Sequence, residues 1–304
     1  MTTPRASRAL STPQTTVTVH PAAGDTAGDA AGVIRVVTCN LRNGGLDGCD
    51  EGRLRRQIAR IAELSPVYAA LQEAKGWEAQ GGRIRRWVEN ELGMSGFLVP
   101  SAHHGCHQLM LVHRDVQVLG ERHATGAPWW HGVGHLIVRF PGRARPAVLL
   151  AVHAAPASPT QRLMEAEALQ LHARRAPNSA QERAEAPDVI MCGDFNAAPV
   201  VPDEADQPEA HPAQAARKQR RDAARAIEDL GLIDAGHALA DPTPTNMQVP
   251  SGDRYLYRAS RIYSRGLTPV SYQVITQTTG TGPPDSDHWP VTADLRPDNL
   301  PTTL

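Results

Sequence analysis

The chain has 304 residues, which is enough for one large or two ordinary domains with a buried core. Its composition, 41% hydrophobic and 21% charged with a formal net charge of −1, is that of a globular protein and neither predicts nor excludes a polyanionic substrate. No apolar window of about 18 residues predicts a transmembrane helix, and no two of the four cysteines have the Cys-x-x-Cys spacing of a structural zinc site.

Residues 1–32 are rich in Thr, Ala, Pro and Gly and lack the apolar core of a secretory signal. This composition predicts a disordered leader on a cytoplasmic protein. A transit peptide is the alternative, but Asp25, Asp29 and the missing amphipathic periodicity disfavour it. We expect a monomer without stable membrane association, and the sequence indicates no protein partner.

Strands and helices alternate through the first half of the predicted folded domain, residues 33–296. Ile34–Asn40 alternates and is β-branched, which predicts a strand. Residues 51–64 carry apolar side chains at helical spacing. Residues 67–73 form a second apolar strand that ends in a carboxylate, and residues 82–92 again have a helical stripe.

The second half continues the pattern. Further strands are predicted at Gln108–His113, 134–140, 147–152, 189–192, 255–257, 272–276 and 291–295, and a helix at 160–174. Residues 199–221 look like a loop insertion, and residues 297–304 like a frayed tail. The basic cluster at 217–221 is interpreted as a solvated helix face, with a phosphate-backbone contact as the alternative. No repeat interrupts the alternation, so we predict one domain of two packed sheets flanked by helices.

The central strand at 189–192 leads to Gly193, after which a carboxylate and an amide stand two residues apart. Alternation places Asp194 and Asn196 on one side of the strand end and turns Phe195 inward. The structural alternative is that Asp194 caps a turn and Asn196 begins a loop.

Five predicted strands have polar side chains at or just past one end: Asn40, Glu73, His153, Asp194 with Asn196, and Asp287 with His288. Each alone could be structural, but their recurrence indicates one common edge. Oxygen ligands without cysteine select Mg²⁺ or Mn²⁺ over Zn²⁺, and Glu73 with Asp287 or Asn40 would supply them. Two imidazoles, a further carboxylate and an amide beside such an ion fit hydrolysis of a phosphate ester.

The ordered set of motifs resembles the metal-dependent endonuclease/exonuclease/phosphatase superfamily. The motifs are Thr38-x-Asn40-Leu41-Arg42, Leu71-Gln72-Glu73, the strand end at His153, Gly193-Asp194-Phe195-Asn196 and Ser286-Asp287-His288-x-Pro290. The resemblance implies a deoxyribonuclease I-like fold, a four-layer α/β/β/α sandwich of two packed mixed sheets, with the site across the top of the central sheets.

Site roles follow from the resemblance alone. It implies that Glu73 is the main Mg²⁺ ligand with Asn40 and Asp287 nearby, that Asp194 positions the attacking water, that Asn196 holds the phosphate, and that His153 and His288 contact phosphate oxygens. Asp253 resembles a further site aspartate, although Ser251 stands where the family usually has Arg. Arg114, as a substrate contact, and the histidines 103, 104 and 107 are expected to border the cleft, with a zinc site at those histidines as the weaker alternative.

The function predicted is a Mg²⁺-dependent phosphodiesterase, with DNA or RNA as the favoured substrate. A phosphatase or phospholipase C-like enzyme acting on a phosphorylated headgroup is the alternative, and a non-catalytic binding module of the same fold is the third. The complete set of polar strand ends speaks against the binding module. These residues do not select the substrate, because specificity is determined by loops.

Overall fold

The computed structural model describes residues 32–173, 186–200, 212–247, 256–276 and 284–298. The predicted leader up to residue 31, Asp253 and most of the predicted tail lie outside these ranges. No helix in the described ranges has the length and apolarity needed to cross a membrane. The monomeric state and the cytoplasmic location stay predictions.

Two six-stranded mixed sheets form the centre of the molecule. The first has the order β11-β12-β1-β2-β4-β3, with β1 Ile34–Asn40, β2 Tyr68–Gln72, β3 Met94–Val99, β4 Gln108–His113, β11 Leu267–Val274 and β12 Val291–Pro297. The second has the order β5-β6-β7-β8-β10-β9, with β5 Gln117–Glu121, β6 Val133–Arg139, β7 Ala147–His153, β8 Asp188–Asp194, β9 Ile233–Asp234 and β10 Ser260–Arg265.

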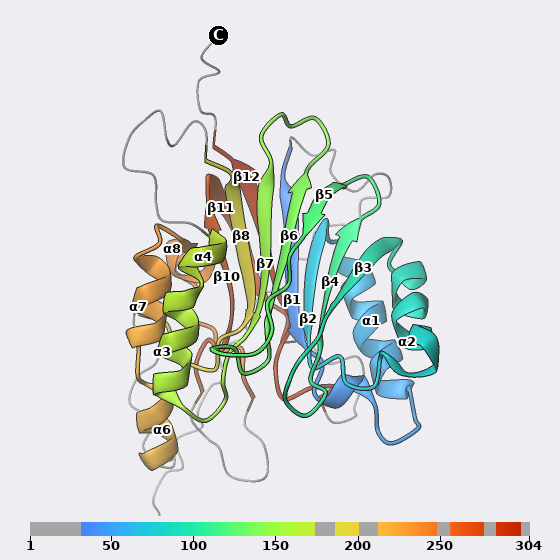
Figure 1. The fold of residues 1–304 in the computed structure, drawn as a ribbon, viewed down its shortest axis with the longest axis horizontal. Coiled ribbons are helices and arrows are strands. Elements are labelled where there is room, and N and C mark those ends of the chain that lie inside the picture. The colour runs from blue at the N-terminus through green and yellow to red at the C-terminus, as the bar shows by residue number, and fades with distance from the viewer. Residues whose placement is uncertain (1–31, 174–185, 201–211, 248–255, 277–283, 299–304) are drawn as a thin grey trace, which may run out of the picture.

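Helices cover the outer face of each sheet, so the molecule has four layers (Figure 1). The helices α1 (Gly52–Leu64) and α2 (Ala79–Glu91) pack on the first sheet, and α3 (Pro159–Ala168) and α7 (Asp222–Glu228) on the second. Shorter helices are η1 (Asn43–Gly45), α4 (Gln170–Ala173), α6 (Pro212–Lys218) and α8 (Ala235–Ala238). The predicted α/β/β/α sandwich is confirmed.

The core has three apolar layers, one between the two sheets and one between each sheet and its helices. Alternation along the central strands supplies side chains to all of them. In β8, Ile190 and Cys192 face the first sheet, whereas Val189 and Met191 face α3 and α7. A strand buried on both faces has to be apolar at every position, which explains the continuous apolar run in the sequence. Cys192 and Cys39 are buried free thiols, as predicted.

Strand direction brings the polar strand ends together. The pairs β1–β2 and β7–β8 are parallel, so all four strands end at one end of the sandwich, the lower end in Figure 1. Strand β12 runs antiparallel to β1, which brings residues 286–290 to the same end. Topology therefore assembles the site from five separate segments.

Several boundaries differ from the prediction. Residues 256–257 are not in a strand, β10 begins only at Ser260, and β3 and β5 were not predicted. The predicted helix 160–174 is divided into α3 and α4, β12 extends to Pro297, and α6 lies inside the predicted loop insertion. The missed strands contain glycine or polar residues on their exposed sides, which weakens their alternation.

Candidate active site

A cleft of about 470 Å³ opens where the strands end. Seven of the predicted site residues line it: Asn40, Glu73, His153, Asp194, Asn196, Asp287 and His288. They come from the ends of β1, β2, β7 and β8 and from the loop before β12. The structure thus brings together residues separated by more than 200 positions in the chain.

The side-chain amide of Asn40 lies between two carboxylates. Its Nδ2 donates to Glu73 Oε1 and to Asp194 Oδ2, each at 3.1 Å. Its Oδ1 accepts the backbone N–H of Arg42 at 2.9 Å, which fixes the orientation of the amide. Because one nitrogen joins both groups, Glu73 and Asp194 belong to the same site.

Glu73 occupies an unusual backbone conformation directly after β2. Its φ of 58° lies in the left-handed region, which costs a non-glycine residue on the order of 1–3 kcal/mol. Its Oε2 accepts the backbone N–H of Asn43 at 2.7 Å. The strained turn and this contact hold a partly exposed carboxylate at the floor of the cleft.

Gly193 allows β7 and β8 to approach closely just before the site. Its φ is 152°, and a Cβ at this position would lie 1.8 Å from the carbonyl oxygen of Val152. No other residue fits here. The glycine predicted to end the strand is therefore inside β8, where it allows His153 to lie directly beside Asp194.

Asp194 is buried and surrounded by donors. Its Oδ1 accepts the backbone N–H of Asn196 at 2.9 Å. Its Oδ2 lies 3.6 Å from His288 Nε2 and 3.8 Å from His153 Nε2. Its Oδ2 therefore has the Asn40 amide within hydrogen-bond distance and both imidazoles slightly beyond it.

Electrostatics keep Asp194 ionised. Burial alone would raise the pKa of this carboxyl, but the electrostatic interactions with His288, His153 and Lys218 outweigh it and lower the pKa to about 2. Burial lowers the pKa of His153, more strongly than Asp194 raises it. At neutral pH the site therefore contains a carboxylate beside a neutral imidazole.

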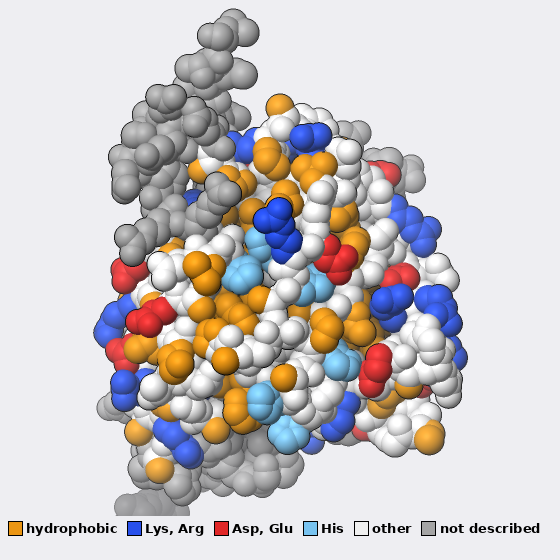
Figure 2. All heavy atoms as spheres, in the orientation of Figure 1, with side chains coloured by type: hydrophobic (Ala, Val, Ile, Leu, Met, Phe, Trp, Pro, Cys, Tyr) orange, Lys and Arg blue, Asp and Glu red, His pale blue; other side chains and the backbone are white. Residues whose placement is uncertain are grey.

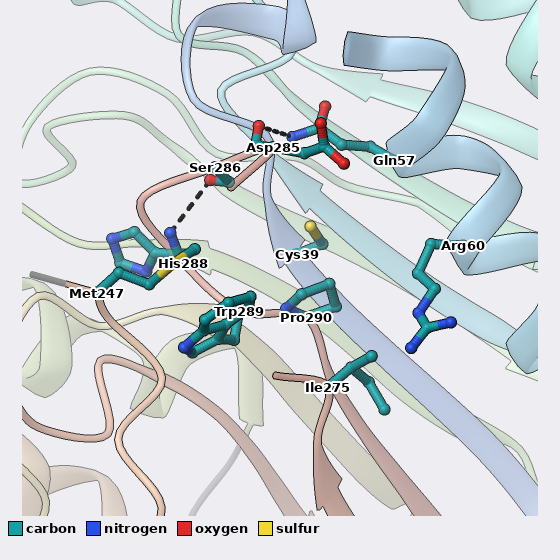
Figure 3. Close-up of a pocket in the computed structure, with 10 residues that line it drawn as sticks. All are labelled: Cys39, Gln57, Arg60, Met247, Ile275, Asp285, Ser286, His288, Trp289 and Pro290. Carbon is teal, nitrogen blue, oxygen red and sulfur yellow. Dashed lines mark hydrogen bonds between the residues drawn. The ribbon is translucent and has the colours of Figure 1, made fainter. Parts of the chain in front are cut away.

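Serine hydroxyls orient His288. Ser286 Oγ donates to the carbonyl oxygen of Asn40 at 2.7 Å and accepts the backbone N–H of His288 at 3.2 Å (Figure 3). Ser260 Oγ lies 3.2 Å from His288 Nδ1. Since Nδ1 is engaged, Nε2 is the ring nitrogen turned toward Asp194.

Helix α1 supports the loop that carries His288. Gln57 Nε2 donates to the carbonyl oxygen of Asp285 at 2.8 Å (Figure 3). It also donates to the carbonyl oxygen of Leu41 at 3.1 Å. Arg53 Nη1 donates to the same two oxygens at 3.0 and 2.8 Å. One helix therefore positions both the loop after β1 and the loop before β12.

Lys218 lies at the site, although its basic cluster was expected mainly to be a solvated helix face, with a phosphate-backbone contact as the alternative. Its Nζ donates to Asn196 Oδ1 at 2.8 Å and to the carbonyl oxygen of Pro156 at 3.0 Å. Asn196 Nδ2 donates to the carbonyl oxygen of Ala154 at 3.0 Å. The basic cluster was interpreted as a solvated face, yet one of its members reaches the cleft because α6 brings it there.

His131 is a second site residue without a sequence signal. Its ring stacks on His153, with centroids 4.1 Å apart and an interplanar angle of 13°. Burial and the neighbouring His153 lower the pKa of His131 to about 3, so it is neutral at physiological pH. It lies in an irregular segment before β6, where no periodicity marks an inward-facing side chain.

The donor set fits a hard cation. Glu73 and Asp287 present carboxylates to one open cleft beside the Asn40 amide. Within the described ranges, no three His, Cys, Asp or Glu side chains are grouped to hold a metal ion by themselves. Mg²⁺ needs only one or two carboxylates and keeps several waters, so the residues present are compatible with it.

The other predicted contacts are not all at the site. Arg114 follows the last residue of β4, which is antiparallel to β2, so it lies at the opposite end of the sheet from Glu73. It lies beside Asn90 there, which contradicts the predicted substrate contact. Asp253 lies outside the described residues.

The three predicted border histidines have separate surroundings. His104 lines the cleft, His103 stacks on Trp130, and His107 Nε2 lies 3.5 Å from Glu78. Histidine side chains are visible at the surface in the lower part of Figure 2. Only His104 among the three faces the cleft directly.

The fold and the arrangement of strand ends define a deoxyribonuclease I-like sandwich, the fold of the endonuclease/exonuclease/phosphatase superfamily. A solved Bacteroides thetaiotaomicron protein of that family matches with a TM-score of 0.60 and 16% identity over 86% of this chain and 97% of that chain. The resemblance predicted from the motifs is therefore confirmed at the level of the fold.

Two further structures have the same fold. D. rerio TDP2, solved with a single-strand DNA product, matches with a TM-score of 0.60 and 17% identity over 87% of this chain and 99% of that chain. The Bacteroides thetaiotaomicron mannosyl-6-phosphatase Bt3783 matches with a TM-score of 0.62 and 15% identity over 86% and 99%. No family model and no curated protein sequence matches this chain.

Proposed function

We propose that the protein is a Mg²⁺-dependent phosphodiesterase that hydrolyses phosphate ester bonds in nucleic acid. The observation that carries the proposal is the Asn40 amide, which joins a carboxylate suited to a metal ion with a buried, ionised carboxylate in one cleft. A site of this kind separates two tasks, charge neutralisation and water positioning, between two acidic residues.

Each residue has a role in this proposal. Glu73 and Asp287 would hold Mg²⁺, which neutralises charge on the phosphoryl oxygens when bound, and the Asn40 amide orients the Glu73 carboxylate. Asp194 stays ionised and accepts a hydrogen bond from the attacking water, which orients the water toward phosphorus. Orientation of a bound nucleophile is itself a large part of catalysis.

Histidine and lysine side chains would stabilise the negative charge of the phosphate. His153 and His288 both line the cleft beside Asp194, where their rings would contact phosphate oxygens. Lys218 fixes the amide of Asn196 and adds a positive charge beside it. Such preorganised groups stabilise charge that develops on the phosphoryl oxygens in the transition state.

The choice of nucleic acid is supported by the cleft and by one similar structure. The cleft contains exposed Lys75 and an aromatic side chain, Trp130, beside the carboxylates. The solved D. rerio TDP2 complex contains a single-strand DNA product. The second candidate is a phosphatase acting on a small phosphorylated compound, which the similar fold of the mannosyl-6-phosphatase favours.

The test is hydrolysis by purified protein of plasmid, single-stranded DNA, RNA, phosphoinositides and sugar phosphates, with Mg²⁺ or with EDTA. We expect release of nucleotides from nucleic acid with Mg²⁺ and none with EDTA. Glu73→Gln should lower kcat/KM by about 100-fold, as expected when a metal ligand is lost. Glu63→Gln, an exposed carboxylate paired with Arg60, is the matched control and should retain activity.

Each result decides between the candidates. Hydrolysis that persists in EDTA, or a Glu73→Gln variant as active as the parent, would exclude the metal role. Hydrolysis of sugar phosphates alone would favour the phosphatase. Affinity for nucleic acid that falls steeply with salt would favour the phosphodiesterase, because phosphate contacts release counterions.

A further inference from the structure

Two aromatic rings stack at the wall of the cleft. The indole of Trp130 and the imidazole of His103 are nearly parallel, with an interplanar angle of 11° and centroids 3.9 Å apart. Trp130 lines the cleft and is partly exposed. His103 therefore supports one face of an indole that belongs to the substrate cavity.

The preceding residue, Trp129, is a buried tryptophan with a structural role and serves as a comparison for Trp130. Trp129 is only 8% exposed and packs in the apolar layer of the second sheet with Leu169 and Ala173. Trp130, the next residue, lies outside that layer and borders the carboxylate cleft instead. Trp129 thus belongs to the apolar layer, whereas the ring of Trp130 contacts the imidazoles of His103 and His131 at the cleft.

The backbone of Trp130 is held on both sides. Its N–H donates to Glu165 Oε1 at 2.7 Å, and its carbonyl oxygen lies 2.6 Å from His103 Nδ1. Glu165 is 3% exposed, and its Oε2 accepts the backbone N–H of Ala155 at 2.9 Å. The same carboxyl group therefore ties the Trp130 segment to the loop that follows His153, so the indole is preorganised.

The stack lies next to the phosphate site. His131 follows Trp130 in the chain and stacks on His153, whose Nε2 is 3.8 Å from Asp194 Oδ2. Ser101 Oγ holds His131 Nδ1 at 3.0 Å. Two stacked imidazoles, His131 and His153, thus lie between the indole and Asp194, so the indole and this carboxylate belong to the same cleft.

We infer that Trp130, supported by His103, is the subsite for an unpaired nucleobase adjacent to the phosphate that is cleaved. This inference rests on the proposed phosphodiesterase function and names its substrate class, single-stranded nucleic acid. An indole stacks on any base, so the subsite tolerates different sequences. A base within a duplex already has both faces covered by its neighbours, so the duplex is the poorer substrate.

The experiment compares two single-stranded oligonucleotides of equal length, one with bases and one with abasic sites throughout. Trp130→Ala should lower kcat/KM for the base-bearing strand at least about tenfold, in the range known for loss of one base–aromatic stack. The same variant should change hydrolysis of the abasic strand less than twofold. Trp130→Phe, which keeps an aromatic face, should recover most of the loss.

Two further variants separate the subsite from general effects on folding. His103→Ala removes the support and should cause a smaller loss in the same direction, again confined to the base-bearing strand. Trp129→Phe alters the adjacent buried ring and should leave the ratio between the two strands unchanged. Thermal melting of every variant shows whether the fold is retained.

A binding measurement keeps this inference separate from the proposed function. Fluorescence anisotropy of labelled base-bearing and abasic strands is measured with Asp194→Asn protein, with and without Trp130→Ala. Tighter binding of the base-bearing strand that disappears with Trp130→Ala supports the subsite. An equal loss for both strands, or no loss, overturns it. If the parent cleaves neither strand, the proposed function fails, and the binding comparison still decides the subsite.

Discussion

Strand β8 carries a buried aspartate at each end, and the two ends of this strand are very different. Asp188 and Asp194 are each 1% exposed. Both oxygens of Asp188 are engaged by guanidinium groups, with Arg143 at 3.1 Å and Arg145 at 3.0 Å. At Asp194, the imidazoles of His153 and His288 lie 3.6–3.8 Å away, and the carboxylate lines a cleft.

The difference between the two aspartates lies in their partners. Burial raises the pKa of Asp188, and the two arginines lower it by less. At Asp194 burial is outweighed by the electrostatic interactions with His288, His153 and Lys218, and the pKa falls to about 2. The same residue type in the same strand, equally buried, forms a closed ion pair at one end and an open site at the other. The groups that surround a buried aspartate, more than the aspartate itself, therefore indicate whether it is structural or functional.

The largest expected effect comes from Asp194→Asn. This change removes the charge that orients the water while keeping an oxygen for the N–H of Asn196, so kcat should fall by about 1,000-fold, within the range for a lost general-base group. Steady-state hydrolysis with Mg²⁺ measures it, and the melting temperature serves as the control for folding. Turnover equal to that of the parent would mean that the water is positioned by another residue.

Asp188→Ala tests the other end of the strand. Two arginines would lose a buried partner, and we expect the free energy of unfolding to fall by about 3 kcal/mol, with kcat of the folded protein unchanged. Urea denaturation gives the stability. Asp294→Ala, which removes a more exposed pair with Arg35, is the control and should cost at most about 1 kcal/mol. A large loss of kcat at unchanged stability would remove the distinction between the two ends.

The smallest effect is expected from Lys218→Met, which keeps an unbranched side chain and removes its charge. Asn196 would lose its donor at 2.8 Å, and kcat/KM should fall by about tenfold, the effect of losing about 1.4 kcal/mol. Arg220→Met, from the same basic cluster but paired with Asp222 at the surface, is the matched control. If both variants lose activity equally, the cluster acts through general attraction rather than through Asn196.

Much of the fold follows from local patterns in the sequence. Strands β1 and β4 have the predicted boundaries, and β8 differs by a few residues, because β-branched or apolar runs mark these central strands. The strand-end residues Asn40, Glu73 and Asp194 were identified because polar groups after apolar strands stand out. Their convergence needed the parallel pairing of β1 with β2 and of β7 with β8, which no local pattern specifies.

The residues that sequence reasoning missed lie outside regular strands. Trp130 and His131 stand in an irregular segment, and Lys218 lies in a helix within a predicted loop. Arg114 was expected to border the cleft as a substrate contact, but the antiparallel direction of β4 places it at the other end of the sheet. In each case the tertiary arrangement decides which side chain reaches the cleft. The hydrophobic periodicity of the sequence does not specify that arrangement.

The left-handed backbone at Glu73 and Asn196 has a consequence for how this molecule can change. With φ of 58° and 51°, both positions would have less backbone strain if the residue were glycine. Selection for thermal stability alone would favour glycine at both turns. The carboxylate of Glu73 and the amide of Asn196 would then be lost from the cleft. At the edge of the cleft, thermal stability and catalytic activity therefore make opposite demands on the backbone. Substitutions chosen only to stabilise the fold would remove the side chains on which activity depends.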